Sequence, residues 1–193
     1  MGVLDHDFPI PELGKATPFG VYDIFKNQGF VNVGLSAETA VFAVESIRRW
    51  WYSEGSGAYA HAEKIVLTAD CGGSNGSRNR LWKFELQKFA NEIGKKIQVL
   101  HYPPGTSKWN KIEHRMFAFI SKNWQGVPLV SAAVIVSLIG ATKTGNGLSI
   151  NCVLDEAEYL KGIEVSPDQF DSISILEYAF HGDWNYTICP LCC

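Results

Sequence analysis

Apolar positions along the chain fall into short runs typical of strands and spaced patterns typical of helices. The runs Gly20–Phe25 and Phe30–Leu35 are rich in Val, Ile and Phe, and the intervening KNQG suits a turn, so together they predict a hairpin. Two later runs, KIVLTAD at 64–70 and KIQVLHY at 96–102, predict further strands. KIVLTAD is mostly apolar, as strands covered on both faces of an α/β sheet are.

Four segments carry apolar residues at the three- and four-residue spacings of an amphipathic helix. Ser36, Ser77 and Ser131 are expected to cap the first, second and fourth of them. Trp109 and Trp124 begin and end the third, and both are expected in the core. The apolar positions are Ala40, Val44, Ile47 and Trp51; Trp82, Leu86, Phe89 and Ile93; Trp109, Ile112, Met116, Ile120 and Trp124; and Val134, Ile135, Leu138 and Ile139.

The order of these elements is hairpin, helix, strand, helix, strand, helix, helix, which predicts a mixed α/β sheet flanked by helices. The chain contains no repeat or low-complexity tract, so residues 1–193 are expected to form a single domain. Its core is assigned to 1–147, and 148–193 is left as an ambiguous carboxyl-terminal extension. Sites in such sheets gather beyond the carboxyl ends of the strands, where Asp70 is placed.

Composition indicates a compact protein of the cytoplasm. Apolar residues make up 46% of the 193 residues, and the longest uninterrupted apolar stretches are far shorter than the roughly 20 residues that span a bilayer. The five cysteines form no spaced disulfide framework. Cys189 and Cys192 make one CxxC without the second pair that a structural zinc site needs, which favours a reduced tail.

Charge is distributed unevenly. Between Arg78 and Lys122 there are ten Lys and Arg against three carboxylates, whereas the rest of the chain has seven against seventeen. Such a basic segment could hold a polyanion. The alternative is a solvated helix face that carries Lys83, Lys88, Lys95 and Lys96.

Two acidic residues border the basic segment or lie within it. Asp70 ends a predicted strand, and Glu113 lies in the first turns of a later helix. Magnesium prefers oxygen ligands and usually takes only one or two protein carboxylates. Two such ions could serve phosphoryl transfer on a nucleic acid. Taken singly, each residue also has a simpler interpretation, Asp70 as a turn cap and Glu113 as an exposed helix residue.

Other chemistries fit the sequence less well. The glycine-rich CGGSNGSR after Asp70 lacks the GxxxxGK[ST] and GxGxxG spacings of nucleotide-binding loops, and it is expected to form a tight turn. A serine nucleophile, Ser74 or Ser77 with His101 or His114, is disfavoured because the chain has no GxSxG elbow.

Long stretches of the chain resemble transposases of the ISAzo13 type, whose catalytic region is also called the Rhodopirellula transposase DDE domain. The matching text includes HDFP, PFGVYD, AVESIRRWW, PPGTSKWNKIEHR and FHGDWNYTI, and it extends to about Ile188. The resemblance implies a ribonuclease H-like fold, in which three acidic residues bind two Mg²⁺ or Mn²⁺ ions for DNA cleavage and strand transfer. It makes Asp70 the second acid and Glu113 the third. It further implies DNA as partner, while a homo-oligomer is left open. Among the basic residues, Arg78, Lys108, Lys111 and Arg115 are expected to contact DNA.

The family's first acid lies on an opening strand upstream of HDFP, and no residue here matches it. Asp5 and Asp7 match the segment after that strand. We therefore expect a partial transposase domain that lacks the first strand and is catalytically incomplete alone. The alternative is a non-catalytic transposase remnant that binds DNA or pairs with an intact transposase.

Overall fold

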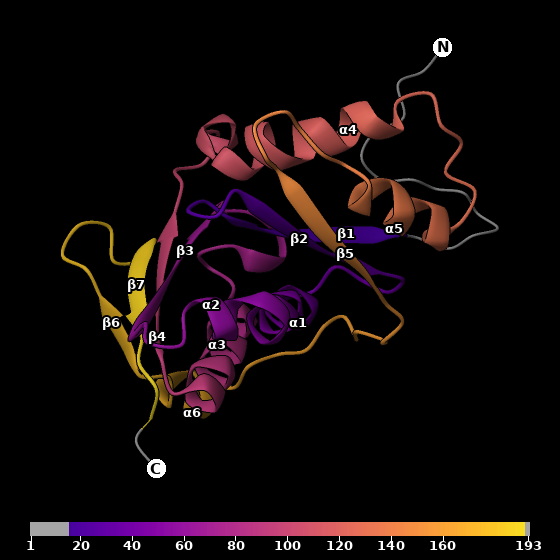
Figure 1. Cartoon of the computed structure of the whole chain (residues 1–193). Helices are drawn as coiled ribbons and strands as arrows, with labels where there is room; N and C mark the ends of the chain where they lie inside the picture. Colours follow the sequence, from indigo (N-terminus) through magenta and orange to yellow (C-terminus); the bar gives the residue numbers. More distant parts are fainter. Residues whose placement is uncertain (1–15, 192–193) are drawn as a thin grey trace. The chain divides into compact units, whose positions relative to one another are not determined.

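The structure is a computed structural model that describes residues 16–191. Its contacts divide the described residues into two compact units, and each unit has a β-sheet of its own (Figure 1). Unit 1 consists of residues 16–38 and 111–160, and unit 2 of residues 39–110 and 161–191.

Unit 1 contains a three-stranded sheet with strand order β1-β2-β5. The hairpin that the sequence predicts is confirmed, because β1 and β2 pair antiparallel across a turn in which Asn27 has a left-handed φ of 55°. The third strand, β5, pairs parallel with β2. The strands are β1 (Thr17–Asp23), β2 (Gln28–Gly34) and β5 (Ser149–Asp155).

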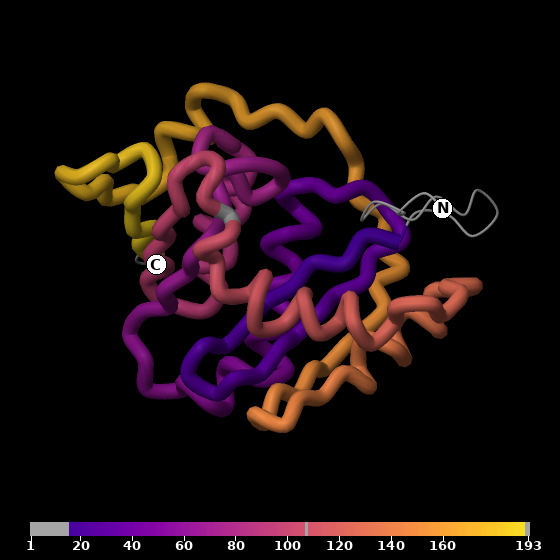
Figure 2. The backbone as a smooth tube through the Cα atoms, turned by 90° about the horizontal axis from the view of Figure 1, so that it is seen from above, coloured from indigo at the N-terminus to yellow at the C-terminus, as the bar shows by residue number. Residues whose placement is uncertain are grey.

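Helices pack on this sheet and bury an apolar core. A π-helical turn, η4 (Glu113–Phe117), continues into α4 (Ala118–Trp124), and α5 (Ala132–Gly140) follows with the predicted cap Ser131. The η4–α4 helix lies across the hairpin (Figure 2). Its core residues are Val31, Val33, Met116, Ile120, Ile135, Ile139, Leu148 and Ile150.

Close approach of the helix to the hairpin depends on Gly20. A Cβ built at Gly20 would lie 2.5 Å from Met116 Cε and 2.7 Å from Phe117 Cζ, well inside van der Waals contact. Glycine at this strand position therefore lets the helix that carries Met116 and Phe117 lie directly on β1.

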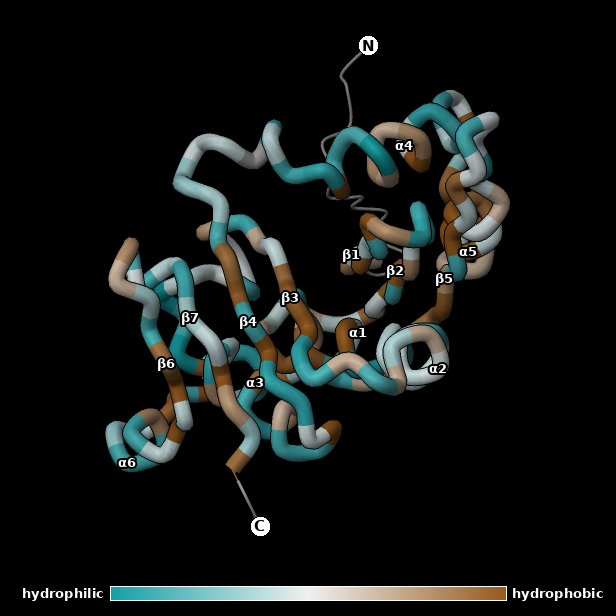
Figure 3. Tube along the Cα trace, turned by 60° about the vertical axis from the view of Figure 1, so that its left-hand side comes forward, coloured by the Kyte–Doolittle hydropathy of each residue, from teal (hydrophilic) through white to brown (hydrophobic). Residues whose placement is uncertain are grey.

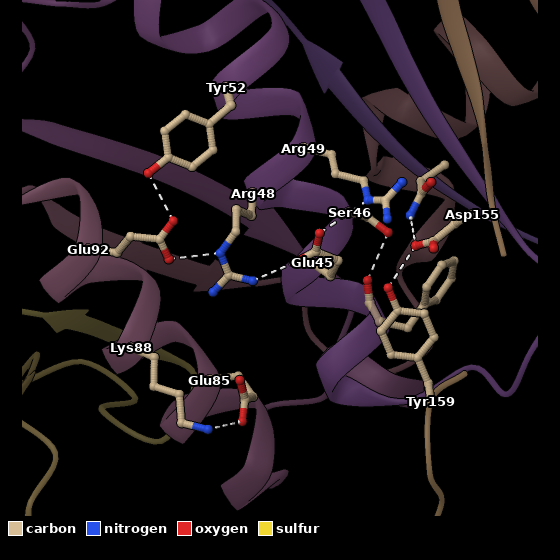
Figure 4. Close-up of polar contacts among 12 residues, drawn as sticks. Glu45, Ser46, Arg48, Arg49, Tyr52, Glu85, Lys88, Glu92, Asp155 and Tyr159 are labelled. Carbon is tan, nitrogen blue, oxygen red and sulfur yellow. Dashed lines mark hydrogen bonds and ion pairs between the residues drawn. The ribbon is translucent and has the colours of Figure 1, made fainter. Parts of the chain in front are cut away.

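A buried carboxylate joins the end of β5 to β2. Asp155 is 1% exposed, and its Oδ2 accepts hydrogen bonds from Asn32 Nδ2 at 3.0 Å and from the Tyr159 hydroxyl at 2.7 Å (Figure 4). Asp155 Oδ1 accepts a third, from the backbone N–H of Ala157 at 3.1 Å. These bonds fix the chain as it leaves the sheet.

Unit 2 contains a four-stranded sheet with strand order β3-β4-β7-β6. The predicted strands β3 and β4 are confirmed and run parallel, while β7 is antiparallel to both β4 and β6. Strand β3 lies at the edge of the sheet and its Val66 is 52% exposed, so the expectation that this strand is covered on both faces is wrong. Strand β4 lies inside the sheet, and hydrophobic residues are found along it (Figure 3). The strands are β3 (Lys64–Ala69), β4 (Lys96–His101), β6 (Ile175–Glu177) and β7 (Asn185–Ile188).

Two long helices accompany this sheet, and both begin at residues other than the predicted caps. Thr39 caps α1 by accepting from Phe42 N, and Asn79 caps α3 by accepting from Trp82 N. Threonine and asparagine serve this role as serine does, so neighbouring polar residues compete for the cap. The helical segments are α1 (Ala40–Trp50), η1 (Trp51–Gly55), α2 (Ser56–Ala58), η2 (Gly73–Asn75), α3 (Arg80–Ile93), η3 (Ser107–Trp109) and α6 (Pro167–Asp171).

Polar contacts join α1 and the following η1 to α3 beside their apolar interface. The Glu92 carboxylate accepts from Arg48 Nε at 2.8 Å and from the Tyr52 hydroxyl at 2.8 Å (Figure 4). These acids and bases lie on the outer sides of helices whose apolar faces bury Ile47, Leu86 and Phe89.

The mixed α/β class with flanking helices is confirmed, with its strands distributed over two sheets instead of one. The ambiguous segment 148–193 is integrated into both, since β5 joins the sheet of unit 1 and β6 and β7 that of unit 2. The expectation of a missing first strand concerns chain before residue 16, where Asp5 and Asp7 also lie, outside the described residues. Within residues 16–191, no helix has the length and apolarity needed to cross a membrane.

Candidate functional site

Asp70 follows β3 directly, as the sequence predicts. Its Oδ1 accepts a hydrogen bond from Asn110 Nδ2 at 3.2 Å, and its backbone carbonyl accepts one from His101 Nδ1 at 2.9 Å. Asn110 is 8% exposed and His101 6%, so both contacts lie at the protein interior. The side chain of Asp70 is half-buried, and among the described residues its Oδ2 has no hydrogen-bond partner.

The loop after Asp70 contains the predicted tight turn, here a short 3-10 helix, η2. Ser74 and Ser77 are buried. The ring nitrogens of His101 contact the Asp70 carbonyl and the Tyr186 hydroxyl. Neither nitrogen is directed at a serine, in agreement with the sequence, which disfavours a serine–His101 nucleophile.

Glu113 belongs to unit 1, where it is exposed and begins η4. The sequence predicts its place in the first turns of a helix, and the structure adds that the turn it begins is π-helical. π-Helical turns inside helices occur frequently at functional sites. Met116, three residues on, is fully buried and anchors this turn in the core of unit 1.

Asn110 is the functional candidate that sequence reasoning missed. It stands three residues before Glu113 in the same motif and bonds the carboxylate of Asp70, forty residues earlier. The position of the Asn110 amide so close to Glu113 in the sequence could have indicated its role, because side-chain amides commonly orient carboxylates. Asn110 ties the segment leading to Glu113 to the end of β3.

The carboxylate of Asp70 suits a hard divalent cation, which prefers oxygen donors. Asp155 also ends a strand but does not suit one, since both of its oxygens already accept hydrogen bonds from the protein. Throughout residues 16–191, no group of three or more His, Cys, Asp or Glu side chains is arranged to hold a metal ion.

The basic segment supplies both engaged and exposed cations. Lys83 is buried, so the interpretation of its helix face as solvated is wrong at that position. Several cations lie over an aromatic ring, beside a carboxylate or at backbone carbonyls: Lys83, Arg80, Lys88 and Lys95. The four cations that the sequence assigns to DNA are all exposed, Arg78 and Lys108 in unit 2 and Lys111 and Arg115 in unit 1.

Trp109 and Trp124 have different environments, although both are expected in the core. Trp109 is 60% exposed, which makes that expectation wrong for it. It ends the short 3-10 helix η3, before the helix that its spacing predicts. Trp124 is half-buried and packs against the core of unit 1.

Comparison of the sequence with known protein families identifies one that matches it. The family described as Rhodopirellula transposase DDE domain matches residues 1–190, essentially the whole chain. Neither a search of curated proteins nor one of solved structures found a match.

The chain therefore belongs to this family of DDE transposases. Its mixed α/β architecture with flanking helices is consistent with a ribonuclease H-like transposase fold. Membership implies a DNA substrate, and DDE transposases normally use divalent metal ions.

Proposed function

We propose that the chain supplies Asp70 and Glu113 as two acidic residues of a DDE site for DNA cleavage and strand transfer. The observation that carries the proposal is the hydrogen bond between Asn110 Nδ2 and Asp70 Oδ1. It joins the strand end that bears one acid to the sequence motif that bears the other.

Covalent geometry supports the same pairing. Only three peptide steps separate Asn110 from Glu113, so their Cα atoms lie within about 11 Å even in a fully extended chain. Because Asn110 contacts the Asp70 carboxylate, the chain returns to Asp70 only three residues before Glu113.

The proposed reaction exchanges one phosphodiester bond for another. A DNA 3′-hydroxyl oxygen attacks the target phosphorus, the bond from that phosphorus to its original 3′ oxygen breaks, and the attacking proton passes to solvent while the leaving oxygen gains one. Mg²⁺ or Mn²⁺, when bound, would supply charge stabilisation and nucleophile activation. Asp70 and Glu113 would hold the ions through their carboxylate oxygens, with Asn110 orienting Asp70.

Arg78, Lys108, Lys111 and Arg115 would contact DNA phosphates. Exposed Lys and Arg bind phosphates without reading sequence, and each contact makes affinity more dependent on salt. Replacing Lys111 and Arg115 by Ala should weaken binding to unrelated DNA sequences equally and reduce the salt dependence.

We further propose that strand transfer needs a third acidic residue besides Asp70 and Glu113, as the family's three-acid site implies. The 193-residue chain alone should then bind Mn²⁺ weakly through its two acids, yet join no transposon-end DNA to a target. Robust strand transfer by this chain, lost in Asp70→Ala and Glu113→Ala, would contradict incompleteness while supporting both acids.

The rival function is a non-catalytic transposase remnant that binds DNA or pairs with an intact transposase. The basic segment favours DNA binding by itself. DNA binding that is indifferent to Mn²⁺, together with Mn²⁺ affinity unchanged by Asp70→Ala and Glu113→Ala, would favour this rival over the metal site.

A further inference from the structure

A chain of hydrogen bonds links Asp70 to the helix α3 through the strands β4 and β7. Trp82 Nε1 donates to the Tyr186 hydroxyl at 3.0 Å, and that hydroxyl lies 3.2 Å from His101 Nε2. His101 Nδ1 in turn lies 2.9 Å from the Asp70 carbonyl oxygen. The four residues come from α3, β7, β4 and the end of β3, all within unit 2.

The chemistry of the two end groups fixes the direction of the two outer bonds, and a neutral imidazole then fixes the middle one. An indole N–H can only donate and a backbone carbonyl can only accept. Tyr186 therefore accepts from Trp82 and, with a neutral imidazole, gives its single O–H to His101 Nε2. His101 is left with its proton on Nδ1, donated to Asp70. One arrangement satisfies every donor and acceptor.

The surroundings favour a neutral His101. Burial lowers the pKa of His101, an effect larger than the opposing one of its bond to the Asp70 carbonyl. The Lys83 ammonium, 4.8 Å from the centre of the Tyr186 ring, lowers it further. Trp82 and Tyr186 are 1% and 0% exposed, so water does not compete for their polar groups.

The same strand end is held by backbone pairing. Ala69 is the register partner of His101, and Tyr102 N donates to the Ala69 carbonyl at 2.8 Å. His101 N itself donates to the Trp184 carbonyl at 3.0 Å, which links β4 to the segment entering β7. The carboxyl-terminal hairpin is thus connected to Asp70 through both main chain and side chains.

We propose that Trp82, Tyr186 and His101 form a positioning relay that holds the backbone at Asp70 and so sets the direction of its carboxylate. This inference rests on the proposed function of Asp70 as a metal ligand. The three residues touch neither metal nor DNA in this scheme. Outer partners that orient metal ligands typically change metal affinity by about 10- to 100-fold when removed.

The first test reads the relay without metal. Nitrogen-15 NMR of the metal-free chain at pH 7 should show the His101 ring as the Nδ1–H tautomer, and Tyr186→Phe should move the Nε2 resonance because that nitrogen loses its hydrogen-bond donor. Tyr178→Phe is the matched control, because Tyr178 lies on the same hairpin and its hydroxyl contacts Thr187 instead. An Nε2–H or doubly protonated ring in the unaltered chain would overturn the relay.

The second test uses Mn²⁺ alone and two substitutions of His101. His101→Asn keeps a donor at the Nδ1 position, whereas His101→Gln keeps only a polar group near Nε2. Mn²⁺ affinity should fall about tenfold in His101→Gln and stay within about threefold of the unaltered chain in His101→Asn. Equal losses in two variants that circular dichroism shows to be folded would mean a packing role and overturn the proposal.

Asp70→Ala separates failure of the relay from failure of the proposed function. If it abolishes Mn²⁺ binding while Tyr186→Phe and His101→Gln have no effect, the metal site stands and the relay is overturned. If Asp70→Ala leaves Mn²⁺ binding unchanged, the proposed function fails. The metal-free tautomer then decides the relay: Nδ1–H supports it and any other form refutes it.

Discussion

Asn110→Asp should destabilise unit 2 through repulsion between two carboxylates. Asn110 Nδ2 donates to Asp70 Oδ1 at 3.2 Å, and the substitution puts an anionic oxygen of similar size in place of that donor. A hydrogen bond to a charged group contributes about 1.5–3 kcal/mol. Two unit charges 3.2 Å apart repel by about 5 kcal/mol at an effective dielectric constant of about 20.

Relaxation of the side chains and counterions reduces this repulsion, so the expected loss in free energy of unfolding is about 2–4 kcal/mol at pH 7. Asn110→Ala, which removes the bond without adding charge, should lose about 1–2 kcal/mol. The gap between the variants should shrink towards pH 4, because a close carboxylate pair binds a proton in the folded state. It should also shrink in 1 M salt, where the Debye length is about 3 Å.

Urea unfolding followed by tryptophan fluorescence measures these differences. All tryptophans except Trp124 lie in unit 2, so the signal reports mainly on the unit that contains Asn110. Equal stability of the Asp and Ala variants at pH 7 and at pH 4 would refute the close contact between Asn110 and the Asp70 carboxylate.

Two further outcomes test other parts of the structure. Gly20→Ala should lower the stability of unit 1 by about 1–3 kcal/mol, because its Cβ would meet Met116 and Phe117. Gly57→Ala, whose Cβ would lie in open space, should cause no such loss. Urea unfolding followed by circular dichroism compares the two variants, and equal stability would refute the close helix–hairpin contact. Burial raises the pKa of the Cys152 thiol to about 12. Iodoacetamide at pH 8 should therefore alkylate Cys152 roughly a thousandfold more slowly in the native chain than in urea, as mass spectrometry would show. Equal alkylation rates would contradict the burial of this thiol.

Local pattern was enough to predict the elements around Asp70 and Glu113. The apolar run of β3 ends at Asp70, and the helical spacing through Met116 and Ile120 places two fully buried side chains beyond Glu113. Ser131 caps its helix as expected, since no nearby polar residue competes for that position. These features depend on residues within a few positions of one another.

Contacts between distant segments could not be predicted in this way. Strands β6 and β7 are only three and four residues long, and the polar Thr187 interrupts the apolar pattern of β7. Lys83 is buried over the ring of Tyr186, which lies about a hundred residues later. The contact of Asn110 with Asp70 likewise follows from a fold that brings two loops together.

Divalent-metal binding by Asp70 and Glu113 is the central claim, and Mn²⁺ titration followed by electron paramagnetic resonance tests it most directly. Asp70→Ala and Glu113→Ala should each reduce Mn²⁺ affinity by at least about tenfold. Glu164→Ala removes an exposed carboxylate outside the proposed site and should leave affinity unchanged. Mn²⁺ affinity that is the same in all three variants as in the unaltered chain would contradict the metal site.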